Sequence, residues 1–305
     1  MKFLRKMLLA MILLGVVVLL FSHFKPDAKE DSLHEGEIGI IDTIDTSRYT
    51  TLSKTKSDIA KGELILVNHD TPYPFAEDTD QLVRVYEYKN SSYMVKDLNV
   101  SLHQSVMEPL NDMLKDFQNQ YSTDALTVIS GHRTFDYQES LYNQSTEKNG
   151  EIEAMKWIAR PGCSEHHTGY ALDFGLYHAD GRSESYEGRG PYKWINENAW
   201  RYGFIVRYPE DKKEQTGIEY EPWHFRYIGR PHSYIAAKYD MCLEEYITYL
   251  KQYQYGKKHL KIMDIDGIQY EIYYTNQLEI PVPLEGPYKI SGNNLDGFIV
   301  TVRVQ

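Results

Sequence analysis

The most informative part of the chain reads S-E-H-H-T-G-Y-A-L-D at residues 164–173, and E-P-W-H follows further along at residues 221–224. Together these two motifs supply imidazoles and a carboxylate. Catalytic zinc commonly takes three protein ligands of this kind and leaves a further position open for water. His166, Asp173 and His224 therefore form a candidate metal-binding set.

The spacing within the motifs predicts a local geometry. His166 and Asp173 are seven residues apart, too far to converge within one strand. A turn at Thr168-Gly169 would fold the loop that carries His166 back beside a strand that carries Asp173. Glu221 precedes His224 by three residues, which lets it approach a water at the metal without being a ligand. There it would take a proton from the water and deliver it to the leaving amine.

Other residues compete for these roles. The chain has 11 histidines, and a single histidine is more often a surface or hydrogen-bonded residue than a ligand. His167 is the nearest rival to His166, and spacing alone does not settle the choice. Cys163 is a candidate nucleophile, but a hydrolytic metal site supplies its own and nothing marks an activated thiol. Three more histidines are weaker rivals as ligands: His132, His178 and His232.

The surrounding sequence predicts an α+β fold, with a small antiparallel sheet flanked by helices that carries the zinc site. Apolar residues at three- and four-residue steps indicate a helix from near residue 101 to residue 121. Short apolar runs predict strands at 63–68, 125–129 and 170–174. Further helices are expected at 135–149, 151–158, 192–202 and 243–250.

The last fifty or so residues have a different texture. Short β-rich runs at 260–264, 268–274, 288–290 and 298–304 predict a small C-terminal β module at 256–305. Asp266-Gly267 supplies a hairpin signal between the first two runs. The sequence assigns this module no function.

The N-terminus has the features of an export signal. Lys2, Arg5 and Lys6 precede an unbroken apolar run at residues 7–21. We expect residues 1–25 to form an uncleaved signal anchor, a single membrane pass that places the rest outside the cytoplasm, in preference to a cleaved signal and a secreted protein. Residues 26–60, rich in charged and hydroxyl side chains, are expected to be an extracytoplasmic linker without a fold of its own. The catalytic domain then spans 61–255.

Composition narrows the function further. A net charge of −11 over 305 residues offers no broad electrostatic footprint for nucleic acid, so we expect no nucleic-acid partner. A hydrophobic content of 42% is that of a folded globular protein. The two cysteines, Cys163 and Cys242, are too few for a disulfide framework.

The pattern S-x-H-x-x-G-x-A-x-D followed by E-x-x-H resembles the VanY-type zinc D-alanyl-D-alanine carboxypeptidases and the related L,D-carboxypeptidases of bacterial wall metabolism. The resemblance covers roughly residues 61–250. Upstream it includes S-G-H-R-T at residues 130–134 with the following Gln138. Downstream it includes W-I-N-E-N-A-W-R-Y-G-F at 194–204 and R-Y-P-E-D-K at 207–212. His132 and Thr134 depart from the family pattern, which usually has Tyr and often Ser at these positions.

The resemblance implies a role for each matching residue. Glu221 would be the general base, and Arg133 would stabilise the oxyanion of the tetrahedral intermediate. Gln138 and Ser164 would help to hold the terminal carboxylate of the peptide. The ligands of Zn²⁺ would be His166, Asp173 and His224.

The implied function is removal of the C-terminal D-Ala from peptidoglycan stem peptides or their precursors, which would give a role in resistance to glycopeptide antibiotics such as vancomycin. An L,D-carboxypeptidase that trims tetrapeptides to tripeptides is the first alternative, because it would use the same residues. A non-catalytic wall-binding or sensor protein with a degenerate site is the second, although no motif position is missing. The sequence leaves the oligomeric state open.

Overall fold

The computed structural model describes residues 36–75, 81–121, 123 and 125–304. The expected signal anchor at residues 1–25, and the first part of the expected linker, lie outside these residues. Within the described part of the chain, no helix combines the length and the apolar character that a membrane crossing requires.

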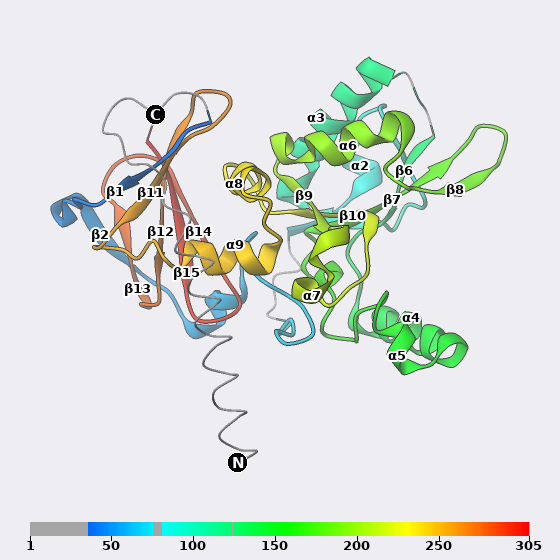
Figure 1. The fold of residues 1–305 in the computed structure, drawn as a ribbon, viewed down its shortest axis with the longest axis horizontal. Coiled ribbons are helices and arrows are strands. Elements are labelled where there is room, and N and C mark those ends of the chain that lie inside the picture. The colour runs from blue at the N-terminus through cyan, green and yellow to red at the C-terminus, as the bar shows by residue number, and fades with distance from the viewer. Residues whose placement is uncertain (1–35, 76–80, 122, 124, 305) are drawn as a thin grey trace, which may run out of the picture.

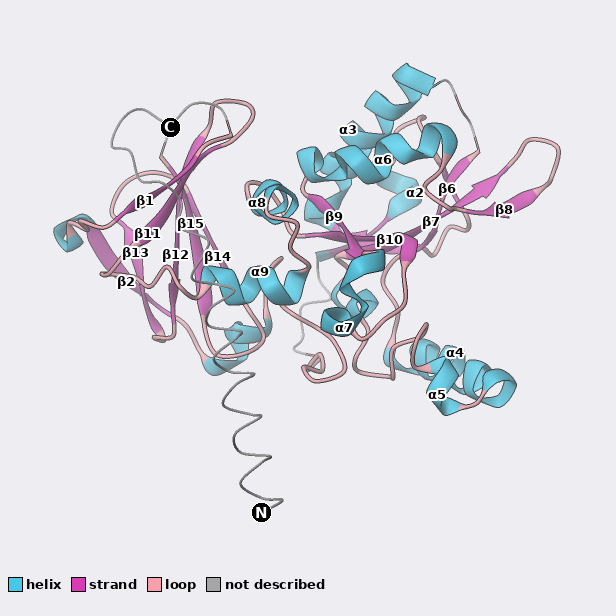
Figure 2. Ribbon diagram, viewed as in Figure 1, coloured by secondary structure: helices cyan, strands magenta, loops and turns pink. Residues whose placement is uncertain are grey.

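The chain forms two bodies, one of mixed helices and strands and one dominated by strands (Figures 1 and 2). The mixed body is built on a sheet in which β4 and β6 are parallel and all other pairs are antiparallel. The strand order is β4 (Met94–Val95), β6 (Leu126–Ser130), β7 (Ala171–Tyr177), β10 (Glu221–Tyr227) and β9 (Phe204–Tyr208), with β8 (Ser183–Ser185) pairing with β7. This sheet with its helices confirms the α+β prediction.

Helix α3 (Gln104–Tyr121) packs its apolar stripe against one face of this sheet, and α6 (Lys193–Asn198) lies on the same side (Figure 1). The predicted helix begins later than expected, because Ser101–His103 form a short strand, β5, paired with β3 (Leu82–Arg84). The predicted helix over 192–202 is a succession of 3-10 turn, α6 and 3-10 turn that ends at Gly203 with a φ of +93°.

Helices α4 (Phe135–Asn149) and α5 (Glu151–Ala154) extend away from the other face of the sheet (Figure 1). The side chain of Thr134 caps α4 by accepting a hydrogen bond from the backbone N–H of Tyr137. The only buried residue of α4 is Gln138. Helix α4 has the predicted bounds, and α5 ends four residues before the predicted residue 158.

The strand predicted at residues 63–68 is absent. The segment is buried at residues 64–67, as its apolar sequence requires, but it forms no ladder. Its backbone groups instead form hydrogen bonds with side chains and with single backbone groups of other segments. The Leu64 N–H donates to Ser291 Oγ, and Arg226 donates to the carbonyls of Glu63 and Ile65. An apolar run identifies a buried segment, but the partners of its backbone decide whether it is a strand.

The second body contains the predicted β module. Its main sheet has the order β1 (Ile38–Ile41), β11 (His259–Met263), β12 (Gln269–Thr275), β15 (Phe298–Arg303) and β14 (Tyr288–Gly292). The hairpin predicted at Asp266-Gly267 joins β11 to β12, which pair antiparallel. An unpredicted strand, β13 (Glu279–Pro283), pairs with β2 (Tyr49–Ser53).

Strands β1 and β2 correct the linker prediction. Residues 36–60, expected to be part of a structureless linker, contain both of these strands and two 3-10 helices. The short apolar run Ile38–Ile41 pairs along the edge of β11, and Tyr49–Ser53 pairs along β13. These segments carry too few apolar residues to fold alone, but they gain backbone partners from strands more than 200 residues away. The β body is therefore assembled from both ends of the described chain.

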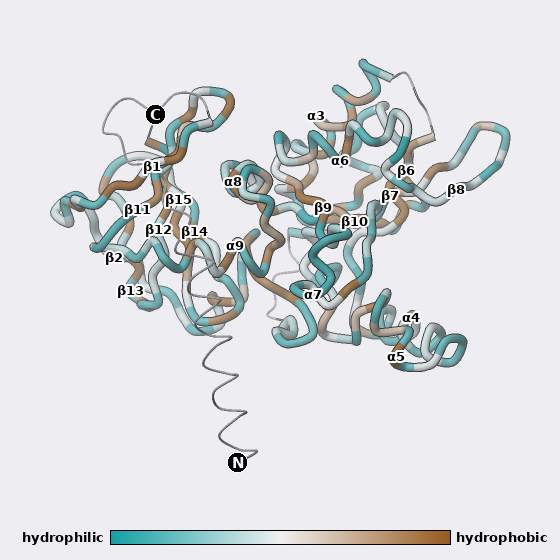
Figure 3. The backbone as a smooth tube through the Cα atoms, viewed as in Figure 1, coloured by the Kyte–Doolittle hydropathy of each residue, from teal (hydrophilic) through white to brown (hydrophobic). Residues whose placement is uncertain are grey.

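Helices α8 (His232–Lys238) and α9 (Leu243–Leu250) lie between the two bodies (Figure 1). Their apolar residues share one buried cluster with strands of the β body and with Leu64 and Leu66. His232 of α8 connects these helices to the β body through hydrogen-bonding contacts with the hydroxyls of Tyr246 and Thr301. Hydrophobic residues run along the strands of both bodies, whereas the loop beyond β7 and β8 is mainly hydrophilic (Figure 3).

Candidate active site

Strand pairing brings Asp173 and His224 together. Strands β7 and β10 are antiparallel neighbours, and their register places Asp173 directly opposite His224. On β7, Leu172 and Phe174 belong to the core beneath α3, so Asp173 between them faces the opposite side of the sheet. The pairing of β10 with β9 is irregular between Glu221 and Phe225, where a bulge changes the local direction of the side chains.

A tight turn brings His166 to the same place. Residues Glu165–Thr168 form a single 3-10 turn that ends at Gly169, whose φ of +74° is left-handed. A Cβ at Gly169 would also lie 2.6 Å from Leu82 Cδ2, so glycine is required there for both reasons. The turn predicted at Thr168-Gly169 is thus present, and it places His166 beside β7.

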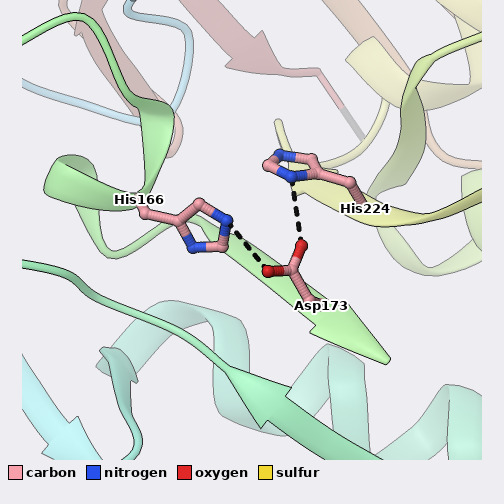
Figure 4. A group of neighbouring side chains, drawn as sticks. All are labelled: His166, Asp173 and His224. Carbon is pink, nitrogen blue, oxygen red and sulfur yellow. Dashed lines mark ion pairs between the residues drawn. The ribbon is translucent and has the colours of Figure 1, made fainter. Parts of the chain in front are cut away.

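The three candidate ligands converge (Figure 4). His166 Nε2 lies 3.3 Å from Asp173 Oδ2, and His224 Nδ1 lies 3.1 Å from Asp173 Oδ1. All three residues are buried, and one ligand atom from each lies within 4.8 Å of the other two. Such a group can hold a metal ion.

The state of the donor atoms fits a zinc ion. His166 Nε2 and Asp173 Oδ1 are buried and make no hydrogen bond. His166 Nδ1 lies 2.6 Å from the carbonyl oxygen of Gly131, which requires the proton on Nδ1 and leaves the lone pair of Nε2 free. The neutral imidazole of His166 and the carboxylate of Asp173 thus have unused lone pairs, and with the imidazole of His224 they make up the donor set of a catalytic zinc site.

Electrostatics also favours a cation here. Burial would raise the pKa of Asp173, but His166 and Arg133 hold that pKa well below its usual range. Burial and the charge of Arg133 lower the pKa of His166 to about 4. Burial would also lower the pKa of His224, but Asp173 and Glu165 raise it to about 9. A cation between these groups would take the place of the His224 proton.

Glu221 lies at the start of β10, on the border of the triad. Its Oε2 is 3.6 Å from His224 Nδ1, and its side chain is almost fully buried. Burial, with the negative charge of Asp173, raises the pKa of Glu221 to about 7. A carboxylate with this pKa can accept and return a proton near neutral pH.

Arg133 reaches the triad from the loop between β6 and α4. Its Nη2 donates to Asp173 Oδ2 at 2.6 Å, and its Nε donates to Ser130 Oγ at 3.0 Å. Gln138, in the first turn of α4, accepts from Arg133 Nη1 at 3.3 Å and donates to the carbonyl of Ala159 at 2.8 Å. Arg133 therefore contacts the triad directly, and Gln138 contacts it only through Arg133.

Ser164 is less directly connected. It is buried and occupies the N-cap position of the 3-10 turn that carries His166. No hydrogen bond among the described residues joins Ser164 to Arg133 or to the triad. Its placement in the site therefore rests on its position in the chain, next to Glu165.

The structure separates the rivals from the site. His167 has both ring nitrogens in use, since Nδ1 lies 2.8 Å from the carbonyl oxygen of Arg133 and Nε2 accepts from the Gly162 N–H at 3.1 Å. His178 Nε2 lies 3.4 Å from Glu184 Oε1 in the β7–β8 hairpin. His232 lies at the junction with the β body, and His132 does not belong to the group of three ligands. Burial raises the pKa of the Cys163 thiol, which argues against an activated nucleophile, and Cys163 and Cys242 are free.

Sequence reasoning missed a set of charged residues behind the site. Glu165, Arg207 and Arg226 have fully buried side chains. Glu165 Oε2 lies 3.5 Å from His224 Nε2. A charged residue next to a motif histidine is normally solvated, so the sequence carried no signal of this burial. Glu165 and Arg207 lie within the motifs at 164–173 and 207–212, but a position in a motif does not show whether the side chain is buried.

Comparison with known proteins defines the class of enzyme. The family model for VanY, described as D-alanyl-D-alanine carboxypeptidase, matches residues 99–230. A D-alanyl-D-alanine carboxypeptidase of Enterococcus faecium is 37% identical over 254 residues, covering 81% of this chain and 77% of the relative. The chain belongs to the VanY family of D-alanyl-D-alanine carboxypeptidases, and it is an enzyme of the zinc metallopeptidase class.

Solved structures agree. The vancomycin-resistance D,D-dipeptidase VanXYg, in complex with a D-Ala-D-Ala phosphinate analogue, is 32% identical with a TM-score of 0.74, covering 84% of this chain and 99% of VanXYg. A mutant of the D,D-pentapeptidase VanY from a VanB-type vancomycin-resistance cassette, in complex with Zn(II), is 31% identical with a TM-score of 0.50. The match covers 61% of this chain and 98% of the VanY chain. The LD-carboxypeptidase LdcB is 28% identical with a TM-score of 0.52, and the match covers 66% of this chain and 95% of LdcB.

Proposed function

We propose that this protein is a zinc D,D-carboxypeptidase that removes the C-terminal D-Ala from peptidoglycan stem peptides. The observation that carries the proposal is the buried group of His166, Asp173 and His224 with Glu221 at its border. Its unused donor atoms fit zinc, and a relative of this fold has been solved with Zn(II). Zinc held there would polarise the scissile carbonyl and make a water more acidic.

The side chains around the triad divide the remaining work. Glu221 takes a proton from the attacking water and returns it to the amine of the departing D-Ala, which its pKa of about 7 allows. Arg133 stabilises the negative charge that develops on the carbonyl oxygen, because its guanidinium stays charged and reaches the site. Gln138 and Ser164 help to hold the terminal carboxylate of the substrate. Burial excludes bulk water and strengthens each of these interactions.

The D-Ala-D-Ala specificity is supported by what the relatives act on. The enterococcal relative is a D-alanyl-D-alanine carboxypeptidase, and VanXYg was solved with an analogue of D-Ala-D-Ala. VanXYg and the VanY mutant are both named for vancomycin resistance, which supports a role of this protein in that resistance. The similarity to LdcB supports the second candidate function, because LdcB is an LD-carboxypeptidase.

Release of D-Ala from a pentapeptide and from a tetrapeptide distinguishes the two activities. The proposal predicts turnover of the pentapeptide ending in D-Ala-D-Ala, and much slower release from the tetrapeptide. Turnover of the tetrapeptide with none of the pentapeptide would replace the proposal with the L,D-carboxypeptidase. No release from either by zinc-loaded protein would reject both.

We also propose that the enzyme acts outside the cytoplasm, held to the membrane by residues 1–25. The sequence of this segment supports the proposal, and the substrate is a component of the wall.

The catalytic domain is proposed to begin near residue 61 and to end near residue 255. The β body then takes its strands from both flanks of this domain, with β1 and β2 before it and β11 to β15 after it. Fractionation of cells that express the full chain tests the location: recovery in the membrane fraction, released by detergent but not by salt, is expected. Recovery in the medium would indicate a cleaved signal.

A further inference from the structure

The strongest unassigned feature is the buried carboxylate of Glu165. Its Oε1 accepts from Arg207 Nε at 2.7 Å and from Arg226 Nη1 at 2.9 Å. The side chains of all three residues have no solvent exposure. Two guanidinium donors on one oxygen are charge-assisted hydrogen bonds that keep this carboxylate ionised. A charged carboxylate is therefore fixed inside the protein, one residue before His166.

The arginines are themselves held by two further parts of the chain, helix α9 and the segment 63–65. Arg207 forms a bidentate pair with Glu244 of α9, with distances of 2.9 and 2.6 Å. Arg226 Nη2 donates to the carbonyl oxygens of Glu63 at 3.0 Å and Ile65 at 2.8 Å. Arg207 and Arg226 lie on neighbouring strands, β9 and β10, and both side chains are fully buried, which leaves them little room to move. The orientation of the Glu165 carboxylate follows from these contacts.

The second oxygen of Glu165 is directed at the metal site. Oε2 is buried and makes no hydrogen bond, and it lies 3.5 Å from His224 Nε2, which is also buried and unpartnered. The other ring nitrogen, Nδ1, faces Asp173 and Glu221. A short adjustment would let Nε2–H donate to Oε2, and the carboxylate can only accept.

A comparison with His166 shows what this contact does. The carbonyl of Gly131 holds the proton of His166 on Nδ1 and leaves Nε2 free. We infer that Glu165 is the corresponding positioning residue for His224, holding its proton on Nε2 so that the lone pair of Nδ1 is directed at the metal. The inference rests on the proposed zinc site. Carboxylates and carbonyls that accept from the distal nitrogen of a ligand histidine orient the ring and increase its basicity.

Glu165→Gln tests this with little change of shape. Since Arg207 and Arg226 both donate, the amide oxygen must face them, and the amide NH₂ must then face His224 Nε2. Nε2 would have to accept, which moves the imidazole proton to Nδ1, where it blocks the metal. We expect the zinc Kd, measured by competition with a chelator, to rise about 10- to 100-fold. The visible spectrum of the Co²⁺-substituted protein should change as well, because the third ligand is displaced.

Glu244→Gln is the matched control. It weakens the same arginine network at Arg207 but does not touch His224, so we expect loss of stability with a zinc Kd within about threefold of the unaltered protein. Equal weakening of zinc binding by both variants would show that Glu165 acts only through stability. An unchanged zinc Kd and Co²⁺ spectrum in folded Glu165→Gln would reject the inference directly.

A measurement on the unaltered protein covers the case in which Glu165→Gln does not fold. Two-bond ¹H–¹⁵N spectra of the zinc-loaded protein identify the protonated nitrogen of each histidine. We expect His224 to carry its proton on Nε2, and a proton on Nδ1 would overturn the inference. If the unaltered protein binds no zinc at all, the proposed function fails instead, so the two failures are distinguishable.

Discussion

The two bodies of the molecule bury polar side chains in opposite ways. Among the described residues, eight buried side-chain atoms have no hydrogen-bond partner, and four of them belong to Glu165, His166, Asp173 and His224. None lies in the chain after His224, although the β body buries several polar residues of its own. The mixed body thus leaves donors and acceptors free where the β body does not.

Asp264 and Asn293 show how the β body pairs its buried polar groups. Asp264 Oδ1 accepts from the N–H groups of Asp266 and Ile268, and its Oδ2 accepts from Arg230 at 2.6 Å. Asn293 Oδ1 accepts from three successive backbone N–H groups in the β14–β15 turn. A buried polar residue with all its partners stabilises a turn, whereas a cluster with missing partners indicates a ligand. The contrast can be tested from either side.

The largest effect is expected at Glu221. Glu221→Ala removes the proton acceptor but none of the three candidate ligands, so we expect kcat/KM to fall about 10²- to 10⁴-fold while zinc stays bound. Release of D-Ala and zinc content are measured on the same sample. Glu219→Ala is the control, because Glu219 is close in sequence but pairs with Lys213. Activity of Glu221→Ala comparable to that of the control would show that another group is the base.

An intermediate effect is expected from pH. The pKa of His224 is raised to about 9 without metal, so zinc must displace a proton at any lower pH. The apparent zinc Kd should rise by about tenfold for each pH unit from 8 to 6. The stability of the metal-free protein should change in the opposite sense. A histidine whose pKa is raised in the folded protein contributes its full stabilisation at pH values below its unfolded pKa of 6.5. This stabilisation is lost as the pH rises through the folded pKa of about 9.

Zinc titrations and denaturant unfolding at the same pH values check both trends. A zinc affinity independent of pH over this range would mean that His224 does not exchange a proton for the metal. A metal-free stability that rises between pH 6.5 and 9 would contradict the raised pKa itself.

The smallest effect on the site is expected from the β body. Asp264→Ala removes the acceptor of two turn N–H groups and the inner partner of Arg230, so we expect a loss of about 2 kcal/mol in the free energy of unfolding. Since Asp264 belongs to a fully paired turn, the zinc Kd should stay within about twofold. Denaturant unfolding and zinc titration measure the two quantities. Weaker zinc binding without loss of stability would contradict the separation of the two bodies.

The sequence predicted the local parts of this structure well. The turn at Thr168-Gly169, the helix over 135–149 and the Asp266-Gly267 hairpin each depend on residues that are close together in the chain. The convergence of Asp173 and His224 depends on the register between β7 and β10, which residue spacing does not encode. It could be predicted only because the two motifs occur together in the chain. The same motifs and their resemblance to a family allowed His166, Glu221 and Arg133 to be proposed.

What escaped prediction depends on distant partners. Residues 36–60 have too few apolar residues to indicate strands, and they form them by pairing with β11 and β13. The segment 63–68 has the composition of a strand, but its carbonyls bond to Arg226 instead of a neighbouring strand. Glu165 lies inside the quoted motif, yet nothing in its local sequence shows that Arg207 and Arg226 compensate its burial.

Zinc content after dialysis against a zinc-free buffer, measured by elemental analysis, tests the central claim most directly. The unaltered protein and Asp264→Ala are predicted to retain one zinc ion per chain, whereas Asp173→Ala is predicted to retain almost none. Absence of zinc from the unaltered protein after loading, or full retention by Asp173→Ala, would contradict the assignment of His166, Asp173 and His224 as the zinc ligands.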